Sequence, residues 1–194
     1  RNDLWRWDGT NWTWGSGSDD AYTDSEYGTK GVPAPGNMPG ARSNTITWTD
    51  ATGGLWLFGG VGVREGSGGI PLCDHWKWDG TNWTWFSGDG ESKSGNYGTK
   101  GVASPDNHPG GRIGSVSFTD PGGDRWLFGG LTFDAYIHRG YLNDLWKWDG
   151  TNWTWMSGSN GEFEFGTYGT KGIAAPTNVP GAREGAVSWT DAGG

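Results

Sequence analysis

One stretch of sequence occurs three times in this chain and constrains its fold more than any other feature. The copies are DLWRWDGTNWTW at residues 3–14, DHWKWDGTNWTW at 74–85 and DLWKWDGTNWTW at 144–155. They begin 71 and 70 residues apart, so nearly the whole chain is an internal repeat. In each copy tryptophans alternate with polar residues on both sides of an Asp-Gly turn, which predicts a β-hairpin.

The composition favours an all-β fold with many tight turns. Of the 194 residues, 39 are Gly and 16 are Trp, and the glycines lie between the alternating runs. Apolar residues at a helical period are interrupted everywhere by Gly or Pro, so no helix is expected. The formal net charge of −8 argues against nucleic acid or an anionic membrane as a partner. No apolar run approaches the roughly 18 residues of a membrane span.

Four strand-like runs recur in each repeat and predict a four-stranded antiparallel sheet. The second repeat shows them as GARSNTITWTD (40–50), LWLFGG (55–60), HWKWDG (75–80) and NWTWFSG (82–88). LWLF is apolar on both faces, and the Trp hairpin carries few charges, so both faces of the sheet need cover. Identical sheets arranged radially cover one another, which is the β-propeller arrangement.

Several motifs resemble the kelch repeat. A double glycine closes the second run of the repeat, and an aromatic pair follows in the next two runs: Gly59-Gly60 with Trp78 and Trp85, and Gly129-Gly130 with Trp148 and Trp155. PGAR, WTD, LWLFGG, NDLWKWD and NWTW resemble the long kelch-like repeats of bacterial proteins. The resemblance covers essentially the whole chain and implies propeller blades of the kind found in the central domain of galactose oxidase. Kelch repeats are about 50 residues long, and the extra residues here lie in two connections.

On this basis residues 1–194 are expected to form a partial, kelch-like propeller of about three four-stranded blades with an incomplete ring. The expected divisions are the last two strands of a first blade with its connection (1–39), a second blade (40–110), a third blade (111–181) and the first strand of a following blade (182–194). Propellers close with roughly 4 to 8 blades. The remaining blades of a longer chain, or other copies, are therefore expected to complete the ring, and a longer chain is the favoured hypothesis.

The connections predict where a partner binds. Short, nearly invariant turns join the first strand to the second and the third to the fourth. Long connections join the second strand to the third and each repeat to the next, so strand direction places them together at the other end of the sheets. Function tends to reside on variable loops. The candidate binding residues are Arg64, Glu65, Asp134, Tyr136, His138 and Arg139.

Residues that recur in every repeat are expected to be structural. The repeated arginines are predicted to donate to backbone or carboxylate groups, although a ring of them could instead bind an anion. The repeated tryptophans are predicted to pack the blades, with a sugar-stacking platform as the alternative. Each Asn-Trp-Thr matches the N-glycosylation pattern, but turn chemistry explains it better. The arginines are Arg42, Arg112 and Arg183, and the first tryptophan set is Trp5, Trp7, Trp12 and Trp14.

No catalytic site, metal site or cofactor is expected. The histidines His75, His108 and His138 fall in different segments. The acidic stretch at residues 19–26 could hold calcium, yet its spacing matches no calcium loop and a solvated loop is favoured. Cys73 is the only cysteine. The copper radical oxidases related to galactose oxidase need a Cys-Tyr thioether, two His and a second Tyr, and the sequence identifies no Tyr partner for Cys73.

The predicted function is a non-catalytic binding or scaffolding module of a larger protein, with a protein or a glycan bound by the long connections. Two alternatives stay open, because propellers host unrelated functions. One is part of a propeller enzyme whose site lies in other blades, and the other is a structural repeat in an extracellular assembly. Few Lys and Cys, with abundant Gly, Thr, Asn and Trp, indicate an exported bacterial protein, secreted or on the cell surface.

Overall fold

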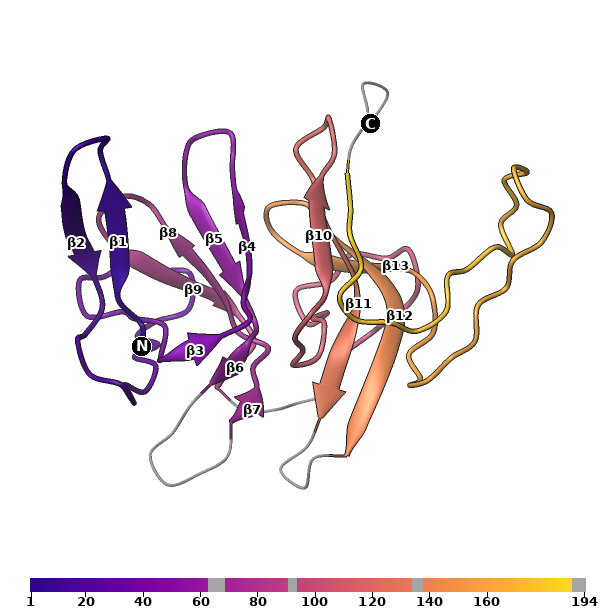
Figure 1. Ribbon diagram of the computed structural model, residues 1–194, viewed down its shortest axis with the longest axis horizontal. Coiled ribbons are helices and arrows are strands. Elements are labelled where there is room, and N and C mark those ends of the chain that lie inside the picture. The colour runs from indigo at the N-terminus through magenta and orange to yellow at the C-terminus, as the bar shows by residue number, and fades with distance from the viewer. Residues whose placement is uncertain (63–68, 91–93, 134–137, 190–194) are drawn as a thin grey trace.

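The computed structural model describes residues 1–62, 69–90, 94–133 and 138–189, and within them the chain forms strands and turns without a helix. The strands make four antiparallel sheets (Figure 1). The all-β prediction is thus confirmed. No helix in the described ranges is long and apolar enough to cross a bilayer.

The second and third repeats each form a four-stranded sheet whose strands lie side by side in chain order. The second repeat contributes β4 (Ile46–Thr49), β5 (Leu55–Phe58), β8 (His75–Trp78) and β9 (Trp83–Ser87). The third contributes β10 (Val116–Thr119), β11 (Arg125–Phe133), β12 (Arg139–Trp148) and β13 (Trp153–Ser157). Every predicted run therefore contains a strand, and the second run lies between the first and the third.

Two smaller sheets complete the set. The first copy of the hairpin motif is a two-stranded sheet, and the beginning of the second repeat pairs with the connection that follows β5. The hairpin strands are β1 (Leu4–Trp7) and β2 (Trp12–Ser16), and the small sheet holds β3 (Arg42–Ser43), β6 (Val61–Gly62) and β7 (Ile70–Pro71). In Figure 1 the β1–β2 and β4–β5 turns lie at one end of the sheets, and β6, β7 and the far ends of β11 and β12 lie at the other.

The double glycine ends a strand in only one of the two repeats. β5 stops at Phe58, whereas β11 continues through the second glycine pair, and its register against β12 shifts between Phe128 and Gly130. Gly129 and Gly130 have φ values of 62° and 110°. At these angles the strand bulges and continues. Part of the stretch 131–143, predicted as a connection, is therefore strand, and Arg139 begins β12 instead of lying on a loop.

The Asp-Gly-Thr-Asn turns are built by the aspartate. Asp79 Oδ1 accepts the backbone N–H groups of Thr81 and Asn82, each at 2.8 Å. Gly80 has a φ of 103°, which a residue with a Cβ rarely adopts. The same two bonds recur in the other two copies of the turn. The aspartate therefore organises each turn, and the repeated Asn takes part in it through its backbone N–H.

The core lies where the sheets of the second and third repeats face each other. Trp56 of β5 packs edge-on against Trp148 of β12 at 6.0 Å between ring centroids, and Phe58 packs against Trp153 at 5.6 Å. All four rings are buried. The prediction that the tryptophans pack the repeats holds here, whereas the β1–β2 hairpin leaves its tryptophans about half exposed.

Candidate functional site

A buried carboxylate joins the connection after the second repeat to the sheet of the third. Asp144, at the start of the third hairpin motif, accepts hydrogen bonds from Arg112 Nη1 at 2.7 Å and Nη2 at 2.8 Å. Its Oδ2 also accepts from the Tyr97 hydroxyl and the Trp146 indole, both at 2.7 Å. Tyr97 comes from the connection, and Arg112 precedes β10. We call this arrangement of Tyr, Arg and Asp the junction lock.

The preceding junction contains the same lock, made by Tyr27, Arg42 and Asp74. The Arg42 guanidinium gives two bonds to Asp74, two to backbone carbonyls and one to Ser25 Oγ. These bonds use all five N–H donors of an arginine. The arginine donates to backbone and carboxylate groups as predicted, and it has no donor left for a bound anion.

The electrostatics keep the lock charged. Burial by itself would raise the pKa of Asp144, but the positive charge of Arg112 and the hydrogen bonds that Asp144 accepts hold that pKa below its ordinary value. Burial and the nearby Asp144 charge raise the pKa of Tyr97 far above its ordinary value. Tyr97 therefore stays protonated and donates to an ionised carboxylate.

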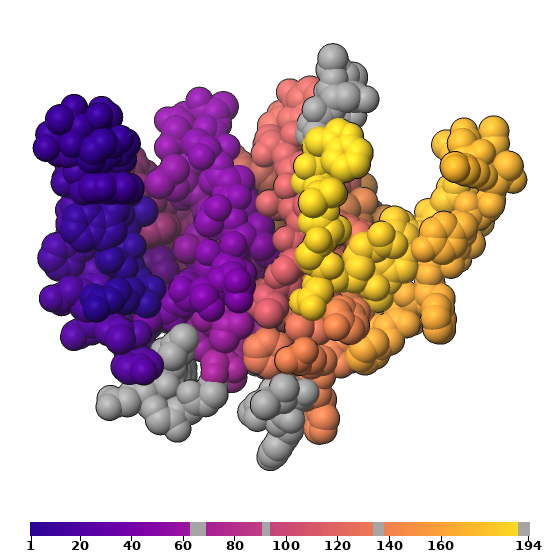
Figure 2. Space-filling view, in the orientation of Figure 1, coloured from indigo at the N-terminus to yellow at the C-terminus, as the bar shows by residue number. Residues whose placement is uncertain are grey.

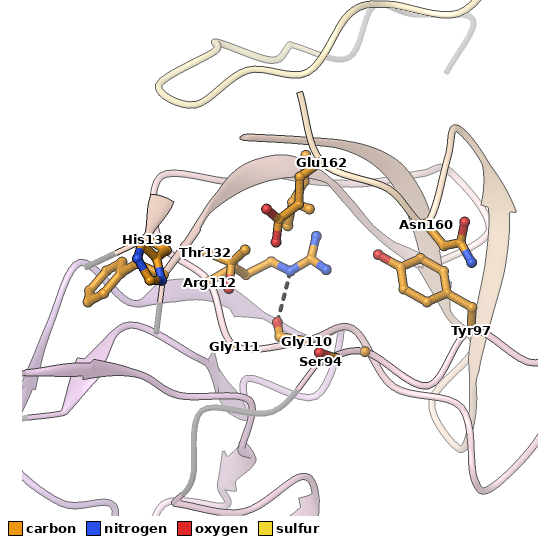
Figure 3. A pocket seen from close by; sticks show the side chains of 12 residues that line it. Ser94, Tyr97, Gly110, Gly111, Arg112, Thr132, His138, Asn160 and Glu162 are labelled. Atoms are coloured by element: carbon orange, nitrogen blue, oxygen red, sulfur yellow. Dashed lines mark hydrogen bonds between the residues drawn. The ribbon is translucent and has the colours of Figure 1, made fainter. Parts of the chain in front are cut away.

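A pocket of about 330 Å³ opens beside the second lock, at the end of the sheets that carries the long connections (Figure 3). Figure 3 shows Arg112 at its centre, with Tyr97 on one side, His138 on the other and Glu162 facing the same hollow. The volume is that of a small-molecule or side-chain site. The pocket is lined further by Ser94, Thr132, Phe133 and Asn160.

Glu162 is held close over β12. A side chain at Gly140 would collide with the Glu162 carboxylate, so the glycine makes room for it. The next residue along the chain, Phe163, stacks edge-on against Tyr141 at 5.7 Å, and its N–H donates to the Tyr141 carbonyl at 2.8 Å. The carboxylate thus enters the pocket from a segment that the next residue, Phe163, anchors to β12.

The preceding junction has a pocket in the equivalent place, about 170 Å³ in volume. Its walls include Tyr27, Gly40 and Leu72, which lie 70 residues before Tyr97, Gly110 and Leu142 of the larger pocket. The other lining positions differ between the two. Asp24, Ser25, Gly62 and Gly90 stand where the larger pocket has Ser94, Gly95, Thr132 and Asn160. The two pockets thus share a frame, made by the recurring Tyr, Gly and Leu, and differ in the other residues that line them.

Two of the predicted binding residues can be placed. His138 lines the larger pocket, whereas Arg139 is an exposed residue of β12 outside its lining. Arg64, Glu65, Asp134 and Tyr136 lie outside the described residues.

Sequence reasoning missed Ser94, Asn160 and Glu162. They belong to the first half of the connection between repeats, which differs from copy to copy as GSDDAYTDSE, GDGESKSGN and GSNGEFEFGT. This variation was the available indication. The predicted binding residues, by contrast, all lie in the connections between the second and third strands of a repeat.

The residues considered for metal binding and for copper chemistry can also be placed. Within the described ranges, no three His, Cys, Asp or Glu are arranged to hold a metal ion, the acidic residues 19–26 included. His75 is completely buried among aromatic rings, where the sheets of the second and third repeats face each other. Cys73 is buried, and its thiol lies 3.7 Å from the Asp89 carbonyl oxygen.

Comparison with known proteins gives no family for the chain, because no family model and no curated protein matches it. The kelch resemblance of the repeated motifs stays a prediction. Any function must therefore be argued from the repeats and from the pocket itself.

Proposed function

We propose that this chain is part of a kelch-like β-propeller that serves as a non-catalytic binding module of a larger extracellular or cell-surface protein. Four-stranded meanders that repeat every 70 residues and bury aromatic residues between neighbouring sheets support the propeller. The sheets of the second and third repeats cover each other, as neighbouring radial blades do. The exported location rests on the composition alone.

The observation that carries the binding role is the pair of equivalent pockets with different linings. Residues needed for folding recur in every repeat, because each junction solves the same packing problem. Apart from the shared Tyr, Gly and Leu of the frame, the residues compared between the two pockets do not recur. Their side chains are thus free to differ without disturbing the lock, and this is the expected behaviour of positions that select a ligand.

The chemistry of the larger pocket suits a polar ligand, either a glycan or a segment of a protein. Ser94, Thr132 and Asn160 offer hydroxyl and amide groups, and Glu162 offers a carboxylate. Phe133 supplies an apolar wall against which a sugar ring or an aliphatic side chain can pack. A small number of polar groups beside an apolar wall is typical of sites that orient a ligand.

The test compares substitutions at the two ends of the sheets. Glu162→Gln replaces the carboxylate of the lining with an amide. Asn160→Gly removes the amide side chain and introduces the residue, Gly90, that the smaller pocket has at this position. Thr151→Ala changes an exposed turn residue at the opposite end and serves as the control. The parent and the variants are applied to arrays of oligosaccharides and of peptides. We expect the pocket variants to lose at least tenfold in affinity, the cost of about 1.4 kcal/mol, and Thr151→Ala to bind as the parent does. If Thr151→Ala lost binding while the two pocket variants kept the affinity of the parent, the ligand would bind at the turn end of the sheets and the proposal would be wrong.

A further inference from the structure

Arg112 has a hydrogen-bond donor that the fold does not use. Its guanidinium gives two bonds to Asp144 and one each to the carbonyl oxygens of Gly110 and Gly129, which take four of the five N–H donors of an arginine. Among the described residues, no oxygen accepts the second N–H of Nη2 with hydrogen-bond geometry, although the Tyr97 hydroxyl lies beside the guanidinium. The side chain is 0% exposed, so this donor depends on what enters the pocket.

The preceding junction shows what kind of group the donor binds. There Arg42 Nη2 donates to Ser25 Oγ at 3.2 Å. Gly95 stands 70 residues after Ser25 and has no side-chain oxygen. A Cβ at Gly95 would come within 2.8 Å of the Gly110 backbone nitrogen, so the chain leaves no room for a serine there. The second lock therefore lacks an acceptor that the first lock contains.

Glu162 is an acceptor without a donor. Among the described residues, its carboxylate has no hydrogen-bond or ion-pair partner. It lies over Gly140 of β12, and Figure 3 shows it facing the hollow that holds the Arg112 guanidinium. Figure 2 shows the third repeat, in orange, and the connection that follows it, in yellow-orange, meeting at the surface. Two unmatched polar groups, one donor and one acceptor, thus face one pocket.

This pair of groups favours an uncharged ligand. Asp144 already balances the charge of Arg112, so the arginine offers one directed N–H and little net attraction for an anion. A carboxylate would accept that N–H but would be repelled by Glu162. An ammonium group has donors only, so it would bind Glu162 and leave the Arg112 donor without an acceptor. A hydroxyl group both accepts and donates, and it suits both sides of the pocket.

The rest of the lining favours hydroxyls that are carried on a ring. Ser94, Thr132 and Asn160 offer groups that donate and accept, and Phe133 offers an apolar ring. A peptide backbone also donates and accepts, but its groups are spread along a chain that extends about 3.3 Å per residue. A sugar instead presents several hydroxyls on adjacent carbons, so several of them reach the walls of one hollow of about 330 Å³.

We propose that the larger pocket binds an uncharged sugar residue, in which one hydroxyl accepts from Arg112 Nη2 and a neighbouring hydroxyl donates to Glu162. This assignment rests on the proposed binding role and names the class of ligand for it. The sugar ring packs against Phe133. The arginine donor is open to the ligand because Gly95 supplies no acceptor, whereas the smaller pocket, whose arginine donor is taken by a serine, lacks this subsite.

The first experiment identifies the class of ligand with the full chain. The parent is applied to an array of oligosaccharides with neutral, amino and acidic members, and to an array of peptides. We expect neutral oligosaccharides to bind, and their matched amino and acidic forms to bind at least tenfold more weakly. The affinity for a neutral member should change by less than about twofold when the salt concentration is raised about tenfold, because no net charge is paired.

The second experiment tests the two contacts with the neutral oligosaccharide that binds best. Glu162→Gln weakens the acceptor, and Glu164→Gln makes the same change at an exposed residue outside the lining and is the control. We expect about tenfold weaker binding by Glu162→Gln and unchanged binding by Glu164→Gln. Derivatives lacking one hydroxyl at a time replace a substitution of Arg112, which would break the lock. Removal of one hydroxyl should weaken binding to the parent but not to Glu162→Gln, and removal of its neighbour should weaken binding to both.

The outcomes separate this inference from the binding role on which it rests. Strongest binding of the amino members, reduced by salt, would show a cation at Glu162 and overturn the uncharged ligand. Binding of peptides alone would overturn the sugar and leave the binding role intact. Binding of neither class would overturn both. Sugar binding to which Glu162→Gln and Glu164→Gln are equally indifferent would place the sugar outside this pocket and overturn the assignment.

Discussion

His75 is a buried residue at which the second copy of the hairpin motif differs from the other two. The other copies have Leu4 and Leu145 there, whereas His75 is completely buried with neither ring nitrogen hydrogen-bonded to a described residue. Its ring lies 4.7 Å from that of Trp148 and 4.9 Å from that of Trp56. A buried polar group without a partner costs about 1 to 3 kcal/mol. We therefore predict that His75→Leu stabilises the protein by about 1 to 3 kcal/mol at pH 7.

The same burial makes the stability depend on pH. Burial, and after it the charge of Arg125, lowers the pKa of His75 from 6.5 to about 3. Between these values the unfolded chain binds one proton more than the folded chain, so the free energy of unfolding falls as the pH drops from about 6.5 toward 3. One pH unit in this window costs about 1.4 kcal/mol, which gives a loss of about 2.5 kcal/mol between pH 7 and about pH 4.5. His75→Leu has no such group, and its advantage over the parent should grow by that amount.

The assay is urea unfolding followed by tryptophan fluorescence at both pH values. His75→Gln is the matched control, because it keeps a buried polar group but cannot titrate. We expect His75→Gln to lack the stability gain of His75→Leu at pH 7 and to share its loss of pH dependence relative to the parent. Contributions of the carboxylates to acid unfolding are common to all three chains and cancel in the comparison. An advantage of His75→Leu that is the same at both pH values would refute the assignment of a neutral, buried His75.

Two further predictions concern the junction lock. Tyr97→Phe removes a hydrogen bond to a buried charged group and should cost about 1.5 to 3 kcal/mol, whereas Tyr168→Phe should change the free energy of unfolding by less than about 0.5 kcal/mol because Tyr168 is exposed; equal effects in urea unfolding would contradict the lock. Arg112→Ala should cost about 3 to 5 kcal/mol because it leaves the buried Asp144 charge unpaired. Because the pKa of Asp144 is lowered, the ion pair stabilises the fold above the ordinary aspartate pKa, and this stabilisation is lost as the pH falls below it. The difference in the free energy of unfolding between the parent and Arg112→Ala should therefore narrow in acid.

Much of the fold could be predicted because local chemistry repeats. The alternation in LWLF and in the Trp hairpins identified the strands, and the Asp-Gly-Thr-Asn turns form the bonds expected of them. The arginines at residues 42 and 112 donate to the kinds of group predicted for them. What a strand does beyond its ends was harder to predict. The glycine pair Gly59-Gly60 follows the end of β5, whereas the pair Gly129-Gly130 lies inside β11. β11 continues because it pairs with β12 beyond the bulge, and no local sequence pattern predicts that pairing.

The junction lock could not be predicted from spacing. Tyr97, Arg112 and Asp144 recur with the repeat, but so do many other residues, and recurrence alone does not say which of them meet. The pocket is still less local, since Ser94 and Glu162 approach from two different connections. A sequence pattern records neighbours along the chain, whereas the pocket is made by neighbours across it. The variable segments were recognised as variable, but their convergence on one hollow needed the structure.

The junction lock stabilises the contact between repeats, whereas the other lining residues of the pocket are free to vary. This difference explains why the repeats share some residues and differ at others. Asp144 and its partners are buried and hydrogen-bonded, so almost any change there breaks a charged pair and costs stability. Thr132 and Asn160 lie against that frame without belonging to it, and the preceding junction has Gly62 and Gly90 in their places within an intact lock. A pocket can therefore gain or lose a hydroxyl or an amide while the junction stays closed. Under the proposed binding role, substitutions can adapt the pocket of one junction at a time, because the free energy that holds the repeats together is carried by other residues.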